Sequence, residues 1–533
     1  MPQSIEHVAI VGCGFTGTSL LFQLIDRCPV RHITIFEASG EFGPGYAYRP
    51  DETPDYLINN TTDTMCLTRH SRRAFLDWLE TKAEFEGVDP RGHLPRRIYG
   101  RFLQEVIEKN KIMAADKGIE LSFLPHEAQS LERLDDGRLR IAWQDGEVVV
   151  DAAVLTTGRC PDRDSVHPPA TAEAVYIPTQ IMSPDMDELA PDATVHVLGA
   201  SLSAYDVVNR LFAEHTGCRF ERNADGVLQY HAGSNERRVV LCSRSGRLKA
   251  AQSRYPMTLN RRHFTKTVMR EKGEAAGLDL SGVKALITAE AEAHGVRLDW
   301  PEIVDPYAGC EDVESVTSRA GEILGATIDA ATDPTGRNFL VDLFADAQFE
   351  VWDAFAGRAL SANAERAYRS DVETAAMVYA APCPVPTAEK LLALLRAGRL
   401  SVVKGVRKIV LSDDQQSFII EHEFGSDAAR VLVNATGATY RDVTSPEQPG
   451  LLRGLAEQGV LRPYRRDGIA MHGAEVDMTS FRLKDADNIY LANMLLWGPG
   501  FFTSSAITMA MVAERIVDDL VERCQQQEER TTT

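Results

Sequence analysis

Three glycines near the N-terminus have the spacing that binds the phosphates of a dinucleotide. Gly12, Gly14 and Gly17 directly follow a β-branched run at 7–11 and open a segment with helical periodicity. In such a strand–turn–helix unit, the first glycine permits the tight turn, the second lets a pyrophosphate approach the backbone, and the third lets helix and strand pack closely. The pyrophosphate then lies on the helix N-terminus. The predicted residues of this loop are Gly12, Gly14, Phe15, Thr16 and Gly17.

An acidic residue stands where this unit needs one. The next apolar run, 32–36, ends at Glu37, which lies 20 residues after Gly17 (37 − 17). A carboxylate there accepts hydrogen bonds from a ribose 2′-hydroxyl and repels a 2′-phosphate. FAD or NAD therefore fits the unit, and NADP does not. A glycine-rich turn that binds nothing is the alternative, but strand, helix and acid all agree with a dinucleotide site.

A second, degenerate unit follows. The run 194–198 leads into Gly199, with Ser201 and Ala204 where the second and third glycines would stand. A later strand, 238–242, ends in hydroxyl and basic residues at the position that Glu37 has in the first unit, and this combination suits a 2′-phosphate. We predict NADPH, with NADH or a vestigial site bordered by a solvated arginine as the alternatives. The predicted residues are Gly199, Ser201, Ser203, Ser243 and Arg244.

The chain also repeats itself on a larger scale. Residues 120–158 and 400–437 both read as β-meanders with alternating apolar positions, and both end in a strand followed by Thr-Gly. These endings, Thr157-Gly158 and Thr436-Gly437, place an open backbone turn where the chain crosses between domains. Coincidence between two β-rich stretches is the alternative.

Several motifs, taken in order, carry a family resemblance. They are Gly12-x-Gly14-x-x-Gly17, Gly43-x-Gly45-x-Ala47-Tyr48, Leu57–Asn60, Phe75–Leu79, Pro95–Leu103, Ser243–Gly246 and Ala435–Gly437. The chain, apart from 265–380, resembles class B flavin monooxygenases with two dinucleotide-binding domains, including amino-acid N-monooxygenases of the nitrosuccinate-forming type. It lacks the Phe-x-Gly-x-x-x-His fingerprint of Baeyer–Villiger enzymes.

The resemblance implies a fold, cofactors and site residues. The fold is α/β, with two Rossmann-like dinucleotide-binding domains of the glutathione-reductase type and a helical insertion. The cofactors are FAD in the first domain and NADPH in the second. Asn493 stands where such folds often carry an aspartate. Further implied cofactor contacts are Gly45, Tyr46, Arg97, Thr157, Gly158, Thr436, Gly437, Asn493 and Ser505.

These parts limit the chemistry. A nicotinamide reduces the flavin, which then needs an electron acceptor. The nine cysteines include no Cys-x-x-Cys pair, so a disulfide acceptor is not indicated. Dioxygen is the most economical acceptor: a C4a-hydroperoxyflavin would hydroxylate the nitrogen of a small amine or amino acid, aspartate-like by resemblance. The alternatives are a reductase that passes electrons to a quinone or partner protein, and a flavin-binding redox sensor.

Two segments offer polar groups to the flavin. Asn59 and Asn60 supply amide donors, although an ordinary Asn-rich loop is equally consistent. Thr503 and Ser504 precede a helical pattern at 507–517, whose N-terminus would stabilise an anionic reduced ring; an ordinary capped core helix is the alternative. Trp497, Phe501 and Phe502 would form apolar walls. Candidate cations for a substrate carboxylate are Arg69, Arg72, Arg96, Arg97, Arg261 and Arg262.

Composition sets the remaining limits. The 533 residues carry a formal charge of −20, which disfavours nucleic acid as a partner. The scattered, odd number of cysteines is typical of a reducing compartment, so we predict a cytoplasmic protein with no metal site. The uncharged stretch 488–513 is broken by Gly498-Pro499-Gly500, which argues against a membrane helix. Homo-oligomerisation stays open.

We expect six segments along the chain. They are an FAD-binding first part (1–185), an NAD(P)H-binding first part (186–264), a helical substrate-side insertion or purely structural insertion (265–380), the NAD(P)H-domain remainder with its meander (381–430), the last FAD-binding part (431–525) and a frayed tail (526–533).

Overall fold

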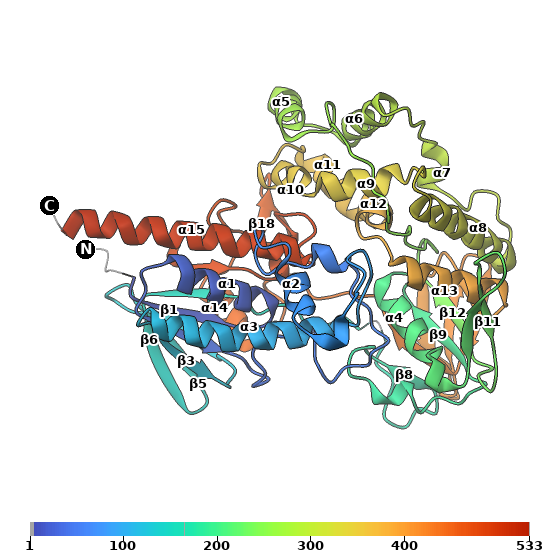
Figure 1. The fold of residues 1–533 in the computed structure, drawn as a ribbon, viewed down its shortest axis with the longest axis horizontal. Coiled ribbons are helices and arrows are strands. Elements are labelled where there is room, and N and C mark those ends of the chain that lie inside the picture. The colour runs from blue at the N-terminus through green and yellow to red at the C-terminus, as the bar shows by residue number, and fades with distance from the viewer. Residues whose placement is uncertain (1–4, 165, 532–533) are drawn as a thin grey trace.

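Two parallel-stranded sheets organise the computed structural model, which describes residues 5–164 and 166–531 (Figure 1). The first sheet has the order β20-β21-β7-β1-β2-β3, parallel except for β20 at its edge. The expected α/β fold class is confirmed. The strands are β1 (His7–Val11), β2 (His32–Phe36), β3 (Glu120–Leu124), β7 (Ala152–Leu155), β20 (Arg482–Leu483) and β21 (Ala486–Leu491).

The second sheet repeats the core of the first. Its order is β13-β12-β9-β17-β8, and all its pairs are parallel. The run β17-β9-β12-β13 therefore matches β7-β1-β2-β3, which confirms the repeat expected from the two meanders. The strands are β8 (Val175–Ile177), β9 (Thr194–Leu198), β12 (Arg238–Cys242), β13 (Leu400–Val403) and β17 (Val431–Asn434).

A three-stranded antiparallel meander accompanies each sheet. Each lies between the last parallel strand of its unit and the strand that returns beside the first, so the duplication includes it. The first comprises β4 (Ser130–Arg133), β5 (Leu139–Trp143) and β6 (Gly146–Val150), and the second β14 (Lys408–Leu411), β15 (Phe418–His422) and β16 (Gly425–Ala429). Two hairpins complete the strands, β10 (Arg219–Arg222) with β11 (Leu228–His231), and β18 (Pro463–Arg466) with β19 (Ile469–Ala474).

Helices cover both sheets. In the first half of the chain they are α1 (Phe15–Arg27), α2 (Ala74–Glu80), α3 (Arg96–Asp116), α4 (Leu202–Leu211), α5 (Lys266–Ala276) and α6 (Leu280–Ala293). In the second half they are α7 (Trp300–Val304), α8 (Val313–Thr332), α9 (Phe339–Asp346), α10 (Gln348–Ala356), α11 (Ala362–Ala367), α12 (Glu373–Ala380), α13 (Val385–Arg396), α14 (Gly450–Glu457) and α15 (Ala506–Thr531). A π-helical turn, Tyr368–Val372, joins α11 to α12.

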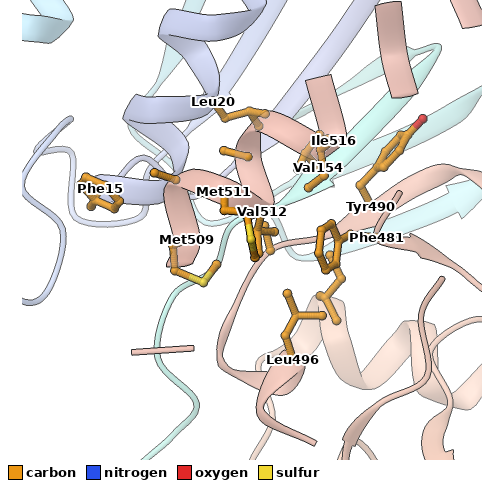
Figure 2. Close-up of a cluster of buried hydrophobic side chains, with 14 of the residues drawn as sticks. Phe15, Leu20, Val154, Phe481, Tyr490, Leu496, Met509, Met511, Val512 and Ile516 are labelled. Carbon is orange, nitrogen blue, oxygen red and sulfur yellow. The ribbon is translucent and has the colours of Figure 1, made fainter. Parts of the chain in front are cut away.

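The C-terminal helix is part of the first domain's core. Helix α15 packs beside α1, although the two lie at opposite ends of the chain (Figure 1). Figure 2 shows Met511, Val512 and Ile516 of this helix among buried side chains from α1 and the first sheet, including Leu20 and Val154. The N- and C-terminal segments therefore stabilise one another.

The helical segment does not form one separate body. Helix α8 packs against α13 and β13, and its Leu324 lies in the core of the second sheet. Phe339 of α9 and Trp352 of α10 instead belong to the core of the first. The segment therefore bridges the two domains, because its apolar faces are divided between them.

Sheet membership also adjusts the expected domain boundaries. Strand β8 at 175–177 and strand β17 at 431–434 both pair within the second sheet, although the expected segments placed them in the FAD-binding parts. Their backbone groups complete the ladder beside β9. In the division that we propose, both strands go to the second domain.

The two connections between the domains run side by side. After Gly158 the chain passes Pro161, whose carbonyl accepts from the Tyr440 amide at 2.9 Å. The Arg163 amide in turn donates to the Ala438 carbonyl at 2.9 Å. The two Thr-Gly turns therefore lead into one paired crossover.

A buried ion pair also joins the domains. Arg96 at the start of α3 lies 2.9 Å from the Asp206 carboxylate on α4. Burial raises the pKa of Asp206 to about 6, and Glu52 acts in the same direction, while Arg96 opposes them. The folded state therefore favours the protonated acid.

This pKa gives a pH prediction. Because the folded pKa exceeds the unfolded value of 3.8, the stability that protonation contributes is present below about pH 4 and is lost as the pH rises towards 6. We expect the free energy of unfolding of the wild type, minus that of Asp206→Asn, to fall by at most about 3 kcal/mol between pH 4 and 7. Denaturant titrations across this range measure it. A difference that rises with pH, or does not change, would contradict the assignment.

Three properties of residues 5–164 and 166–531 concern membranes, metals and thiols. In this part of the chain no helix is long and apolar enough to cross a membrane. Within 5–164 and 166–531, no group of His, Cys, Asp and Glu side chains could hold a metal ion. All nine cysteines are free thiols, and eight of them are buried.

Candidate functional site

The first glycine loop has no room for side chains. Gly12 has φ +101°, and a Cβ there would lie 2.4 Å from the Thr156 carbonyl oxygen. A Cβ on Gly17 would lie 2.2 Å from the Gly12 carbonyl oxygen, so α1 and β1 meet backbone to backbone. Gly14 is the N-cap of α1 and caps it with no side chain, which leaves the first N–H groups of the helix for an anion. Phe15 and Thr16 form its first turn.

A second glycine lies against this loop. Gly45 has φ +57°, and a Cβ on it would lie 2.7 Å from the Cα of Gly14. A Cβ on Gly100 in α3 would come within 1.8 Å of the Tyr48 carbonyl oxygen, so α3 presses the 43–48 segment onto the loop. Arg97 stands in the first turn of α3.

The acid at the end of β2 is held in place. The Glu37 carboxylate accepts from the Cys13 amide at 2.9 Å and from the Ser39 hydroxyl at 2.8 Å. It therefore lies beside the glycine loop and keeps lone pairs for a ribose hydroxyl. A dinucleotide fits these features. The glycine loop and the uncapped N-terminus of α1 would hold its pyrophosphate, and the Glu37 carboxylate would bind its ribose.

The second loop repeats the geometry of the first. Gly199 has φ +115°, and a Cβ on it would lie 2.6 Å from the Ala435 carbonyl oxygen, just before Thr436 and Gly437. Its amide donates to the Cys242 carbonyl at 2.8 Å, as the Gly12 amide donates to Phe36 at 2.9 Å. The two loops are thus locked between the same neighbours, a returning strand and an adjacent strand end.

The side chains around this loop differ from those of the first. Ser201 is the N-cap of α4 and makes no side-chain cap, and Ser203 follows half-buried in the first turn. Beyond β12, the Ser243 hydroxyl accepts from the Gly246 amide at 2.9 Å, and Arg244 is exposed. An exposed arginine here, where the first unit has Glu37, fits an added phosphate.

The first crossover turn meets the strand end at Asn493. The buried Asn493 amide donates to the Thr157 hydroxyl at 2.9 Å and accepts from the Leu495 amide at 2.9 Å. The Met494 amide donates to the Gly158 carbonyl at 3.1 Å. An aspartate could keep this contact only by accepting from the Thr157 hydroxyl, so asparagine sets the direction of the hydrogen bond.

Tyr46 lies against the residue after this turn. Tyr46 is 45% exposed, its hydroxyl accepts from Arg159 at 3.1 Å, and the Arg159 guanidinium lies 5.4 Å from the ring centroid. Tyr46 and the Thr157-Gly158 turn are therefore brought together through an arginine that the sequence motifs did not single out.

The four predicted catalytic residues fall in two places. Asn59 lines a small cavity against Tyr205 and Asp206 of α4, with Asn60 next to it. Thr503 is buried and Ser504 is exposed, just before α15. Within the described residues, no hydrogen bond joins the two pairs. The Ser505 carbonyl accepts from the Met509 amide at 3.0 Å, so the helix begins where predicted.

An arginine-rich cluster beside Trp497 was missed by the motifs. The Trp497 indole donates to Glu373 at 2.6 Å, and Arg369 donates to Glu373 at 2.8 Å. The Arg441 guanidinium lies 4.2 Å from the Trp497 ring centroid. One signal was available: Arg159 and Arg441 both follow the repeated Thr-Gly turns. Arg369 lies in an alanine-rich helical stretch without a motif.

Comparison with known proteins agrees with this geometry. Residues 9–160 match the FAD-NAD(P)-binding family. The chain is 27% identical over 265 residues to nitrosuccinic acid synthase npaA of Aspergillus oryzae, covering 45% of this chain and 40% of that protein. It is 24% identical over 292 residues to the uncharacterized Escherichia coli protein YdhS, covering 52% of this chain and 53% of that one. The chain thus spans about half the length of the relatives that it matches.

Solved structures share the whole fold at low identity. L-lysine 6-monooxygenase from Pseudomonas syringae aligns over 98% of this chain and 99% of that chain, with TM-score 0.55 and 13% identity. DfoA bound to FAD, a cadaverine monooxygenase of Erwinia amylovora, aligns over 98% and 95%, with TM-score 0.51 and 12% identity. The chain therefore contains a segment, 9–160, that matches the FAD-NAD(P)-binding family, and its fold is similar to that of L-lysine 6-monooxygenase and DfoA.

Proposed function

We propose that this protein is an FAD-dependent, NADPH-consuming monooxygenase that hydroxylates the nitrogen of a small amine or amino acid. The observation that carries the proposal is the duplicated loop geometry, with Glu37 at one loop and Arg244 at the other. The first loop, Glu37 and Gly45 would hold FAD, and Gly199, Ser201 and Arg244 would hold NADPH. Held there, FAD would supply the redox chemistry that couples oxidation of NADPH to oxygenation of the amine by dioxygen.

This chain's own residues would position the flavin and exclude water. Asn493 fixes the Thr157 turn, and the α15 N-terminus after Ser505 provides a positive dipole end. Gly500 allows the Trp352 indole to pack on the loop, since a Cβ there would lie 2.6 Å from that ring. Phe501 stacks on Phe355 at 5.7 Å. Such an apolar wall keeps water from a reactive oxygen donor.

An aspartate-like substrate is our best proposal within this class. It is supported by the name of the npaA relative, which shares 27% identity over 45% of this chain. We place the protein in the cytoplasm, in keeping with its nine free thiols. Dioxygen and a small amine are its proposed partners.

The nucleotide preference is tested at Arg244. Replacing this exposed arginine with serine is expected to raise the KM for NADPH roughly 10- to 100-fold, because a charge-assisted contact to the 2′-phosphate is lost. The KM for NADH should change less than about twofold. Steady-state flavin reduction with both nucleotides measures this. Equal losses with NADPH and NADH would show that Arg244 does not contact the 2′-phosphate.

Product analysis tests the proposed reaction. The FAD-loaded protein is incubated with NADPH, L-aspartate and dioxygen enriched in oxygen-18. The masses of the products are measured by mass spectrometry. We expect an N-oxygenated product that carries the heavy isotope. NADPH oxidation that yields only hydrogen peroxide or water with every amine tested would refute N-hydroxylation.

A further inference from the structure

Three arginines gather where the paired crossover meets the loop that contains Trp497. Arg159 follows the first Thr-Gly turn, Arg441 follows the second, and Arg369 lies on the π-helical turn. Arg159 is paired with Asp162 and donates to Tyr46. Arg369 donates to Glu373 at 2.8 Å and to the Gly500 carbonyl at 2.7 Å. Both of these arginines are therefore engaged.

Arg441 is different. In the described chain, its guanidinium makes no hydrogen bond and no ion pair, and its contact is the face of Trp497 at 4.2 Å. That indole is fixed in turn, because its N–H donates to Glu373 at 2.6 Å. The backbone is also rigid, since the Arg441 carbonyl accepts from the Gly473 amide at 2.7 Å. A Cβ on Gly498 would come within 1.7 Å of the His472 carbonyl oxygen.

The guanidinium of Arg441 is partly shielded from solvent and lies near two other cations. Burial lowers the pKa of Arg441, and Arg369 and Arg159 act in the same direction, while Glu373 raises it. Arg369 and Trp497 both donate to Oε1 of Glu373, and among the described residues no carboxylate forms an ion pair with Arg441. Tyr368, next to Arg369, also has a buried hydroxyl with no hydrogen-bond partner in the described residues. The guanidinium of Arg441 and the hydroxyl of Tyr368 are therefore two polar groups that a bound anion could pair with.

Three of the six arginines that the sequence offered for this task have other partners. Arg96 pairs with Asp206 at 2.9 Å. Arg261 is paired with Glu350 at 2.7 Å, and Arg69 with Glu514 at 3.3 Å. These three stabilise the fold and are not free to bind a ligand.

We propose that Arg441, stacked on Trp497, binds the carboxylate of the substrate, so that the enzyme selects amines that carry a carboxylate. This inference rests on the proposed function. It places a planar fork, suited to bidentate carboxylate binding, close to the Thr157–Asn493 junction. Simple amines without a carboxylate would leave the guanidinium unpaired and are disfavoured for that reason.

The test uses the FAD-loaded protein with Arg441→Met and Arg441→Lys. The matched control is Arg430→Met, an exposed arginine between β16 and β17. Succinate, which is L-aspartate without the amine, is titrated by calorimetry, and NADP+ is titrated separately. Steady-state N-oxygenation compares L-aspartate with ethylamine, and L-lysine with cadaverine, which are the same amines without carboxylates.

We expect Arg441→Met to raise the dissociation constant of succinate and the KM for carboxylate-bearing amines by roughly 10- to 100-fold. Arg441→Lys should recover part of this, because lysine keeps the charge and loses the fork. Binding of NADP+, FAD content and the Arg430→Met control should not change.

Other outcomes overturn the proposal in distinguishable ways. Weaker NADP+ binding with unchanged succinate binding would assign Arg441 to a cofactor phosphate. If Arg441→Met binds both succinate and NADP+ as the wild type does, Arg441 binds neither anion and the proposal is wrong. If the wild type binds succinate through Arg441 but oxygenates no amine, the proposed function fails and carboxylate binding stands.

Discussion

Replacing Gly199 with alanine is expected to slow NADPH-dependent flavin reduction on the order of 100-fold while FAD stays bound. Gly199 has φ +115°, and the new Cβ would lie 2.6 Å from the Ala435 carbonyl oxygen. The loop must move, and with it the N-terminus of α4 that would hold the nicotinamide dinucleotide. The first sheet and its glycine loop are not touched by this change. Stopped-flow flavin bleaching with NADPH measures the rate.

Two further variants complete this experiment. Gly12→Ala makes the same clash in the first loop, at 2.4 Å from the Thr156 oxygen, and is expected to abolish FAD binding. Gly454→Ala in α14 meets nothing within 4 Å and is expected to be neutral, or to stabilise by up to about 1 kcal/mol. Normal reduction of Gly199→Ala by NADPH would show that the second loop holds no nucleotide.

Replacing Arg466 with methionine is expected to reduce the free energy of unfolding by about 3–5 kcal/mol. Arg466 in β18 pairs with the buried Glu365 of α11 and donates to the Leu360 carbonyl at 2.7 Å. Burial raises the pKa of Glu365, and Tyr464 lies 3.3 Å from the same carboxylate. Without Arg466 the acid is left buried beside a single weak donor. Denaturant unfolding, followed by tryptophan fluorescence, measures the loss.

A surface arginine in the same region is the control. Arg462 is paired with Asp485 at 2.8 Å, with both side chains about half exposed, so Arg462→Met should cost less than about 1 kcal/mol. A similar small cost for Arg466→Met would mean that the pair does not attach the helical segment to the first domain. Loss of Arg466 should also loosen the loop at Gly500, because Arg369, on the π-helical turn that follows α11, donates to the Gly500 carbonyl.

The sequence was most informative at positions where the backbone conformation or a close backbone contact requires glycine. Gly12, Gly17 and Gly199 were predicted from spacing alone, because only glycine tolerates their φ values or contacts. The repeat was visible because a meander followed by Thr-Gly has a local pattern. These features depend on neighbours within each unit.

The rest depends on contacts between distant segments. Arg441 meets Trp497, and Arg369 meets Gly498 and Gly500, only after the helices have folded over the crossover. Sequence periodicity does not indicate contacts between distant segments, so the arginine cluster was not predicted. Strands β8 and β17 likewise join the second sheet through partners that are distant in the sequence, so the sequence pattern does not reveal their place. The roles of Asn59, Asn60, Thr503 and Ser504 stay predictions.

Rapid mixing of the NADPH-reduced, FAD-loaded protein with oxygenated buffer tests the central claim most directly. The flavin spectrum is followed with and without L-aspartate. We predict a transient spectrum distinct from those of oxidised and reduced flavin, which decays faster when the amine is present. Failure of NADPH to reduce the flavin, or reoxidation at the same rate with and without every amine and with no oxygenated product, would contradict it.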